Sequence, residues 1–168
     1  CFGTQDVVVI VVMDVDGTLT DGKLYISSEG ESFKTFDVKD GYGIKNILKS
    51  HGIKTAIITA RKSDIVSRRA KELDIDYVYQ GIEDKLLCLR QLLEETACSF
   101  EDIVYVGDDV NDISCIEKAG LGCCPADAHE SVKCVAKYIA MHKGGQGAVR
   151  EIIDVNIDCI RAHGASES

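Results

Sequence analysis

Residues 7–18 of the chain, VVVIVVMDVDGT, decide how the rest of the sequence must fold. Val7–Met13 is an unbroken apolar run rich in β-branched side chains, which is typical of a strand buried on both faces of a parallel sheet. The run ends in Asp14-Val15-Asp16-Gly17-Thr18, so two carboxyl groups follow at the end of the strand. Ligands of open α/β sheets bind beyond the carboxyl ends of the strands. The stretch therefore predicts a buried strand that delivers Asp14 to a site, although an acidic turn with a glycine is also a common way to leave any strand.

Apolar segments alternate with amphipathic ones over the remainder of the chain. The predicted strands are Val7–Met13, Ile53–Thr59, Tyr77–Gln80, Ile103–Val106, Leu121–Cys124 and Tyr138–Ala140. The predicted helices cover about residues 41–50, 63–73, 84–96, 112–119 and 148–161. Asp40 and Ser63 are suited to cap the first two helices, and Gly52 to end the first. This alternation predicts an α/β protein with a Rossmann-like, doubly wound parallel sheet.

Two short segments after the first strand, Lys23–Ser27 and Ser32–Asp37, predict a β-hairpin that protrudes from the sheet. Residues 28–31 are expected to form its turn. A lone hairpin is too small to be stable by itself, so its apolar side chains are expected to pack against a partner, with packing on its own domain as the alternative. These side chains are Leu24, Ile26, Phe33 and Phe36.

Length and charge narrow the classes of function. A chain of 168 residues with 45% hydrophobic residues is long enough for one domain with a real core, and too short for two ordinary ones. The net charge of −9 argues against a nucleic-acid partner, because phosphate backbones attract basic surfaces. A small anionic substrate stays compatible with this charge, since a metal ion and a few local cations can reverse the field within a pocket.

Eight cysteines are present, but no Cys-x-x-Cys pair occurs and the four histidines are scattered singly. Cys88 falls in a leucine-rich helix, and Cys123 and Cys124 fall at a strand end, where small apolar residues are expected. Free buried thiols in a reducing cytoplasm are the preferred interpretation. Val7–Met13 is too short to span a bilayer and lacks the features of a signal peptide, so we expect no membrane association and a cytoplasmic protein.

Three further polar positions stand at strand or helix ends in the same order along the chain. Thr59 ends the second long strand, Lys85 begins the leucine-rich helix, and Gly107-Asp108-Asp109-Val110-Asn111-Asp112 follows the strand at Ile103–Val106. Together with Asp14-Val15-Asp16-Gly17-Thr18, these segments resemble motifs I to IV of the haloacid dehalogenase superfamily. Four matches in the same order, each in the expected structural context, do not arise readily by chance.

The resemblance implies phosphoryl transfer, and the residue types suit that chemistry. An in-line nucleophile is required, and the carboxylate of Asp14 can form an aspartyl-phosphate. Asp16 can protonate the leaving alkoxide and then deprotonate the hydrolytic water. In the ATPase branch of the superfamily this position is threonine, so Asp16 favours a phosphatase. Thr59 is expected to hydrogen-bond the transferring phosphoryl group and Lys85 to neutralise its charge.

A cluster of carboxylates at one sheet edge repels itself unless a cation is present, so a magnesium ion is expected on electrostatic grounds as well. The family pattern supplies Mg²⁺ with the Asp14 carboxylate, the Asp16 backbone carbonyl and the Asp108 carboxylate. Asp109 and Asp112 are expected around these ligands, holding metal-bound waters or orienting Lys85. For Asp112, an ordinary helix cap is the alternative.

The spacing leaves no room for a cap domain, because 45 positions separate Asp14 from Thr59 and 26 separate Thr59 from Lys85. The segments 36–44 and 144–151 resemble the capless branch that cleaves phosphorylated sugar acids, such as 3-deoxy-D-manno-octulosonate 8-phosphate. Members of this branch are homotetramers whose hairpins pack centrally and whose sites borrow from a neighbour. The resemblance thus implies one phosphatase domain over residues 1–168, with a hairpin at about 23–37 and a C-terminal tail at about 143–168.

The carboxylate of such a substrate requires cations, and Lys39, Arg61 and Arg150 are the candidates. The alternative for each is a solvated surface cation. Arg61 resembles the eight-carbon branch, whereas the nine-carbon branch tends to have an acidic residue there; Ala60 departs from the glycine often found beside it. Two alternatives stay open. One is a phosphatase, or a cytidylyltransferase-associated phosphatase domain, for a nine-carbon acid such as N-acylneuraminate 9-phosphate. The other is a non-catalytic module that only assembles a tetramer.

Overall fold

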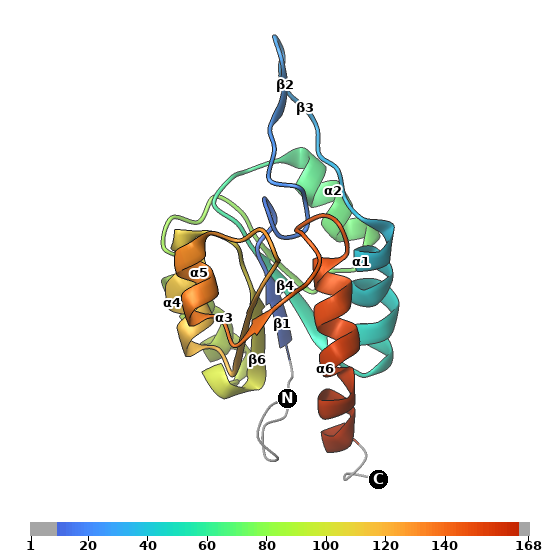
Figure 1. The fold of residues 1–168 in the computed structure, drawn as a ribbon, viewed down its shortest axis with the longest axis vertical. Helices are drawn as coiled ribbons and strands as arrows, with labels where there is room; N and C mark the ends of the chain where they lie inside the picture. Colours follow the sequence, from blue (N-terminus) through green and yellow to red (C-terminus); the bar gives the residue numbers. More distant parts are fainter. Residues whose placement is uncertain (1–9, 165–168) are drawn as a thin grey trace.

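The computed structural model describes residues 10–164, which form a six-stranded parallel sheet flanked by helices (Figure 1). The order of the strands is β5-β4-β1-β6-β7-β8, and every neighbouring pair is parallel. The predicted doubly wound α/β sheet is therefore confirmed, while Val7–Val9 of its first strand lie outside the described residues. The strands are β1 (Ile10–Met13), β4 (Lys54–Ile58), β5 (Tyr77–Tyr79), β6 (Ile103–Val106), β7 (Leu121–Cys124) and β8 (Tyr138–Ile139).

Helices cover both faces of the sheet because both faces of its central strand are apolar. Val11 and Met13 of β1 pack on one face, and Ile10 and Val12 pack on the other. The first face carries α1 (Val38–Tyr42), the π-helical turn η1 (Gly43–Leu48), α2 (Asp64–Glu72) and α6 (Ala148–Gly164). The second face carries α3 (Lys85–Thr96), α4 (Ile113–Lys118) and α5 (Glu130–Val135), of which α5 was not predicted.

The register of the central strands brings the predicted motifs to one edge. Met13 of β1 pairs with Ile57 of β4 on one side and with Val106 of β6 on the other. Asp14, Thr59 and Gly107 follow these paired residues within one or two positions, so all three leave the sheet at its carboxyl edge.

The hairpin differs in detail from the prediction. Its strands are β2 (Tyr25–Ser27) and β3 (Gly30–Phe33), joined through Ser28 and Glu29 rather than through a four-residue turn. Gly30 takes a φ of +114°, which favours glycine and lets the chain reverse early. Figure 1 shows the hairpin standing clear of the sheet, above the carboxyl end of β1. In the described chain, neither the hairpin segment nor the segment between β4 and α3 contains a cap domain.

The predicted start of the first helix is wrong. Asp37, not Asp40, is the capping residue: its Oδ1 accepts hydrogen bonds from the backbone N–H groups of Lys39 (2.6 Å) and Asp40 (3.3 Å). Asp40 lies inside the first turn, and its Oδ1 accepts a hydrogen bond from the backbone N–H of Arg150 (2.9 Å). Asp40 therefore caps α6, which begins 108 residues later in the chain, and ties α1 to it.

The expectations about the cysteines and about membrane-spanning segments can be compared with the described residues. Cys88, Cys115, Cys123 and Cys124 are buried free thiols. Among residues 10–164, no helix is both long enough and apolar enough to cross a membrane.

The buried Asp40 carboxyl generates a prediction about stability and pH. Its Oδ2 has no hydrogen-bond partner among the described residues, and burial raises its pKa from 3.8 to about 6. A carboxyl whose pKa is raised on folding favours the folded state below pH 3.8, and this contribution is lost as pH rises through 6. Asp40→Asn keeps the acceptor oxygen but cannot ionise. We therefore expect the free energy of unfolding of the wild-type protein to fall by up to about 3 kcal/mol relative to that of Asp40→Asn between pH 4 and pH 7. Urea unfolding at each pH measures this difference.

The control for this experiment is Asp158→Asn, an exposed carboxyl on α6. Its stability difference from wild type is expected to change little over the same pH range. Parallel pH profiles for wild type and Asp40→Asn would contradict the prediction.

Candidate active site

Asp14 lies at the centre of the site because the end of β1 turns sharply around it. Its backbone N–H donates to the carbonyl of Val106 (2.9 Å), which extends the pairing of β1 with β6 by one residue. The carbonyl of Val15 then accepts from the N–H groups of Thr18, Leu19 and Thr20, so the chain closes into a compact loop. The side chain of Asp14 is buried at the floor of this loop.

Lys85 holds two carboxylates in the interior of the protein. Its Nζ lies 2.9 Å from Asp14 Oδ1 and 2.9 Å from Asp112 Oδ1, and its side chain is 1% exposed. Asp84 caps α3 by accepting from Leu87 N–H, so the helix begins at Lys85 and directs it to the sheet edge. Burial opposes the charge on Lys85, but the two carboxylates outweigh it and raise its pKa above the ordinary value.

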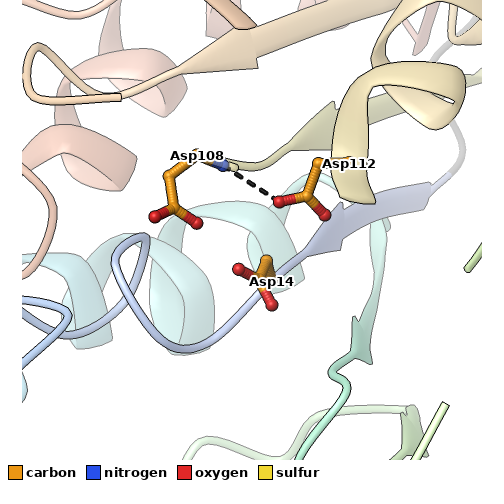
Figure 2. Close-up of side chains that lie close together, drawn as sticks. All are labelled: Asp14, Asp108 and Asp112. Atoms are coloured by element: carbon orange, nitrogen blue, oxygen red, sulfur yellow. Dashed lines mark hydrogen bonds between the residues drawn. The ribbon is translucent and has the colours of Figure 1, made fainter. Parts of the chain in front are cut away.

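Asp112 is held from several sides at once. Its Oδ1 also accepts from the hydroxyl of Tyr105 (2.7 Å), and its Oδ2 accepts from the backbone N–H groups of Asp108 (3.1 Å) and Asp109 (3.3 Å). Figure 2 shows the bond to Asp108 N–H. Both carboxylate oxygens are thus occupied, as an orienting role toward Lys85 requires. The side chain does not cap α4.

Asp108 and Asp14 face one another across the loop (Figure 2). Carboxylate oxygens of Asp14, Asp108 and Asp112 all lie within 4.8 Å of one another. Gly17 makes the approach of Asp108 possible, because a Cβ at that position would stand 1.9 Å from Asp108 Oδ2. The hydroxyl of Thr18 donates to Asp108 Oδ1 (3.4 Å).

The charges of this cluster do not balance. Three carboxyl groups face the single ammonium of Lys85. Burial raises the pKa of Asp14, and the charge of Asp112 adds to the effect. Burial likewise raises the pKa of Asp108, together with its contact with Asp14. A divalent cation would stabilise the ionised form of both carboxyl groups. Mg²⁺ prefers oxygen ligands of this kind. The residues present therefore fit such an ion, with Asp108 and the second oxygen of Asp14 available to bind it while both oxygens of Asp112 are bonded.

The remaining predicted catalytic positions lie around this cluster. Thr59 is buried at the end of β4, where its backbone N–H donates to the Tyr79 carbonyl (3.0 Å). The Asp16 side chain points to the hairpin, and its Oδ1 accepts from Lys34 Nζ at 2.6 Å. Asp109 is exposed and caps the short helical turn η3 (Val110–Asp112).

The predicted substrate-binding cations fall into two groups. Arg61 follows β4 and lies half exposed, 3.6 Å from Glu31 of the hairpin. Arg150 and Lys39 lie together between α1 and α6, where Arg150 donates to the Lys39 carbonyl (3.3 Å) and to Asp154 (3.0 Å). They line a hollow of about 430 Å³. Within the described chain, no hydrogen bond or ion pair joins Lys39 or Arg150 to the carboxyl cluster.

The glycines of the tail contact the loop after β1 of their own chain, residues 15–20, which is named the catalytic loop after the role predicted for Asp16. A Cβ on Gly144 would stand 1.9 Å from the Gly17 carbonyl oxygen, and Gly145 N–H donates to the Thr18 carbonyl (3.2 Å). Asp127 fixes this arrangement by accepting from Gly144 N–H (2.9 Å). The tail therefore packs closely against the loop after β1 within one subunit.

Sequence reasoning missed two residues that bond to the predicted ones. Tyr105 supports Asp112, and Lys34 supports Asp16. A tyrosine inside a fully buried strand needs a partner for its hydroxyl, so the sequence allowed a buried contact of Tyr105 to be predicted. There was less reason to predict a contact of Lys34 from the sequence, because a lysine in a hairpin is usually solvated.

Comparisons with known proteins agree with this geometry. Residues 78–153 match the model of the haloacid dehalogenase-like hydrolase family. The chain is 44% identical over 146 residues to the 3-deoxy-D-manno-octulosonate 8-phosphate phosphatase KdsC of Escherichia coli K12, covering 87% of this chain and 77% of that protein.

Two solved structures are similar over nearly the whole chain. The phosphatase of the same name from Moraxella catarrhalis, in complex with magnesium, phosphate and a KDO molecule, matches with a TM-score of 0.87 and 38% identity, covering 96% of this chain and 94% of that one. The cobalt-bound enzyme from Haemophilus influenzae matches with a TM-score of 0.89 and 33% identity, covering 94% and 92%. The chain therefore belongs to the haloacid dehalogenase-like hydrolases, within the family of the 3-deoxy-D-manno-octulosonate 8-phosphate phosphatases.

Proposed function

We propose that this protein is a magnesium-dependent phosphatase that hydrolyses 3-deoxy-D-manno-octulosonate 8-phosphate. The observation that carries the proposal is the buried group of Asp14, Lys85, Asp108 and Asp112 at the carboxyl edge of the sheet. Relatives at 44% identity bear the name of this phosphatase, and the similar Moraxella structure holds magnesium, phosphate and the sugar acid. The complete catalytic set argues against a non-catalytic assembly module.

The residues divide the reaction into two steps. Asp14 attacks phosphorus, the bond from phosphorus to the sugar oxygen breaks, and Asp16 gives a proton to that oxygen. Water then attacks the phosphorus of the aspartyl-phosphate while Asp16 takes a proton from it, which releases inorganic phosphate and restores Asp14. Lys85 and Thr59 would stabilise the charge of the phosphoryl group in both steps.

Magnesium would be held by the carboxylates of Asp14 and Asp108 and by the backbone carbonyl of Asp16. It would neutralise the phosphoryl oxygens during transfer. Asp112 would act through Lys85, because both of its oxygens are already bonded, and Asp109 would act on metal-bound water.

The substrate carboxylate requires a cation, and Arg61 is the candidate within the same chain. It is half exposed and leaves the end of β4 directly after Thr59 and Ala60. Lys39 and Arg150 are candidates for a carboxylate bound in a neighbouring subunit, since within the described chain no hydrogen bond or ion pair joins them to the carboxyl cluster.

We infer that the assembly is a homotetramer of single-domain subunits in the cytoplasm. The support is the hairpin, whose side chains Leu24, Ile26 and Phe33 are 53%, 64% and 50% exposed. Apolar side chains exposed on so small an element are typical of a surface that a partner covers. A neighbouring subunit would also enclose a site that has no cap domain.

The first test is turnover. We expect Mg²⁺-dependent release of phosphate from 3-deoxy-D-manno-octulosonate 8-phosphate, with a higher kcat/KM than for N-acylneuraminate 9-phosphate. Asp14→Asn should lower kcat by about 10³-fold or more, because the amide is no nucleophile, while circular dichroism shows an unchanged fold. An equal or reversed preference between the two substrates would contradict the substrate assignment, and substantial turnover by Asp14→Asn would contradict the nucleophile.

The second test concerns the metal. In Gly17→Ala the new Cβ would collide with Asp108 Oδ2, so Asp108 must leave its place beside Asp14. We expect the Mg²⁺ concentration for half-maximal activity to rise by about tenfold or more. Gly52→Ala is the control, since Gly52 also has a positive φ (+69°) but open space around it. It should cost about 1 kcal/mol of stability and leave the Mg²⁺ dependence unchanged. Equal shifts in both variants would contradict the role of Asp108.

The third test concerns assembly. Ile26→Asp places a charge on the most exposed apolar side chain of the hairpin, and we expect it to convert tetramers to smaller species in sedimentation velocity. Activity should fall with the loss of the tetramer. Leu87→Asp, at a comparably exposed position on α3, is the control and should stay tetrameric. A wild-type monomer with full activity would overturn the shared-site proposal.

A further inference from the structure

One side chain of the hairpin segment, that of Lys34, reaches Asp16 in the candidate active site. Lys34 follows β3, and its Nζ lies 2.6 Å from Asp16 Oδ1 and 3.1 Å from Glu31 Oε2. The Lys34 side chain is only 2% exposed, although most residues of the hairpin before it are exposed. A lysine in a protruding hairpin is ordinarily solvated, so this burial requires a specific reason.

Electrostatics supplies part of that reason. A buried ammonium costs several kcal/mol unless it is paired, and here two carboxylates pair with it. Asp16 is the less buried of the two carboxylates, with 25% of its side chain exposed. One of its oxygens is anchored by Lys34, while part of the side chain stays accessible to solvent.

Glu31 connects the same lysine to the loop after β4. Its Oε1 accepts from the Ser63 hydroxyl (3.0 Å), and its Oε2 lies 3.6 Å from Arg61. Burial opposes ionisation of Glu31, yet the hydrogen bonds from Lys34 and Ser63 lower its pKa below the usual range. Ser63 precedes α2 but makes no side-chain capping bond to it, and its hydroxyl instead donates to Glu31.

Charges of alternating sign thus run from the loop after β1 through the hairpin segment to the loop after β4. The sequence of contacts is Asp16, Lys34, Glu31, Arg61. Lys34 and Glu31 are neighbours in the hairpin segment, whereas the contacts with Asp16 and Arg61 join it to segments that are distant along the chain. Through these contacts the hairpin segment is joined to Asp16, the residue to which we assign proton transfer.

We propose that Lys34 is a positioning residue for Asp16: by anchoring Asp16 Oδ1 at the base of the hairpin, it leaves Oδ2 aligned for proton transfer to the leaving group. The inference rests on the proposed function of Asp16 as general acid and base. Removing the anchor gives the carboxyl group additional rotamers, of which few face the leaving oxygen. The loss should therefore appear in kcat more than in KM.

Two substrates separate the steps that Asp16 serves. Departure of a sugar alkoxide needs a proton from Asp16, whereas p-nitrophenolate leaves without one. Attack of water on the aspartyl-phosphate needs Asp16 as a base with either substrate. In Lys34→Met, the aryl substrate should therefore phosphorylate Asp14 at a nearly normal rate, and hydrolysis should become slow.

The experiment measures both phases. For 3-deoxy-D-manno-octulosonate 8-phosphate, we expect Lys34→Met to lower kcat by about 10- to 100-fold with KM changed by about twofold or less. For p-nitrophenyl phosphate, rapid mixing should show a burst of one nitrophenolate per subunit before slow turnover. Lys34→Arg should retain activity within about tenfold of wild type, because it restores a charged donor.

Matched variants exclude a merely structural role. Lys23→Met makes the same replacement at an exposed position of the hairpin segment and should leave both phases unchanged. The pair Asp16→Asn and Lys34→Met should be no slower together than Asp16→Asn alone, because Lys34 acts through Asp16. If Lys34→Met is unstable to heat, Lys34→Gln provides the same comparison.

Three results would overturn the inference: multiplied effects in the double variant, a burst well below one per subunit, or a Lys34→Met enzyme as active as Lys23→Met. A wild-type enzyme that hydrolyses the aryl substrate but not the sugar-acid phosphate would contradict the proposed substrate. It would leave the test of Lys34 intact, since the burst does not depend on the sugar acid.

Discussion

The ammonium group of Lys85, buried between Asp14 and Asp112, is the interaction on which the site depends. Removing a charge from water is costly, so the lysine is stable only where two carboxylates receive it at 2.9 Å. Those carboxylates in turn repel each other and are tolerated in the interior only with the lysine between them. Since Asp14 comes from the end of β1 and Asp112 from the segment after β6, the same ammonium group joins two strands at their catalytic ends.

Close approach of backbone is the second requirement of this arrangement. Gly17 lets Asp108 reach Asp14, and a Cβ on Gly107 would stand 2.4 Å from Asp112 Cγ. Gly144 lets the tail lie against the catalytic loop from the other side. Any side chain at these three positions would displace a carboxylate or the loop itself. The glycines therefore determine how tightly the acidic groups assemble, and with that how strongly the site attracts a cation.

The second ion-pair chain, through Lys34, links this rigid centre to the exposed hairpin. The hairpin exposes apolar side chains, while Glu31 and the following Lys34 contact Asp16, Arg61 and Ser63. One segment is thus placed to serve two purposes. Its exposed apolar side chains suit contact with another subunit, and Lys34 holds the residue to which we assign proton transfer. A site without a cap domain has few other means of shaping its entrance.

Local patterns were sufficient for the strands of the sheet, for most of the helices and for the central residues. Apolar runs predicted each long strand, because burial on both faces demands it. The polar residues at the ends of those strands predicted the cluster around Asp14, because parallel strands all deliver their carboxyl ends to one edge. Asp108 followed from the same rule, and Lys85 followed from its place at the start of a helix and from the family pattern.

Contacts between distant segments decided the rest. Asp37 and Asp40 are equally good helix caps by residue type, and the choice between them depends on Arg150 N–H, 110 residues away, which takes the carboxylate of Asp40. Ser63 stands at the right place to cap α2, yet Glu31 of the hairpin engages its hydroxyl. Lys34 gave no local sign of burial. In each case a polar side chain has several possible partners near it in sequence, and only packing brings forward the distant group that competes successfully for it.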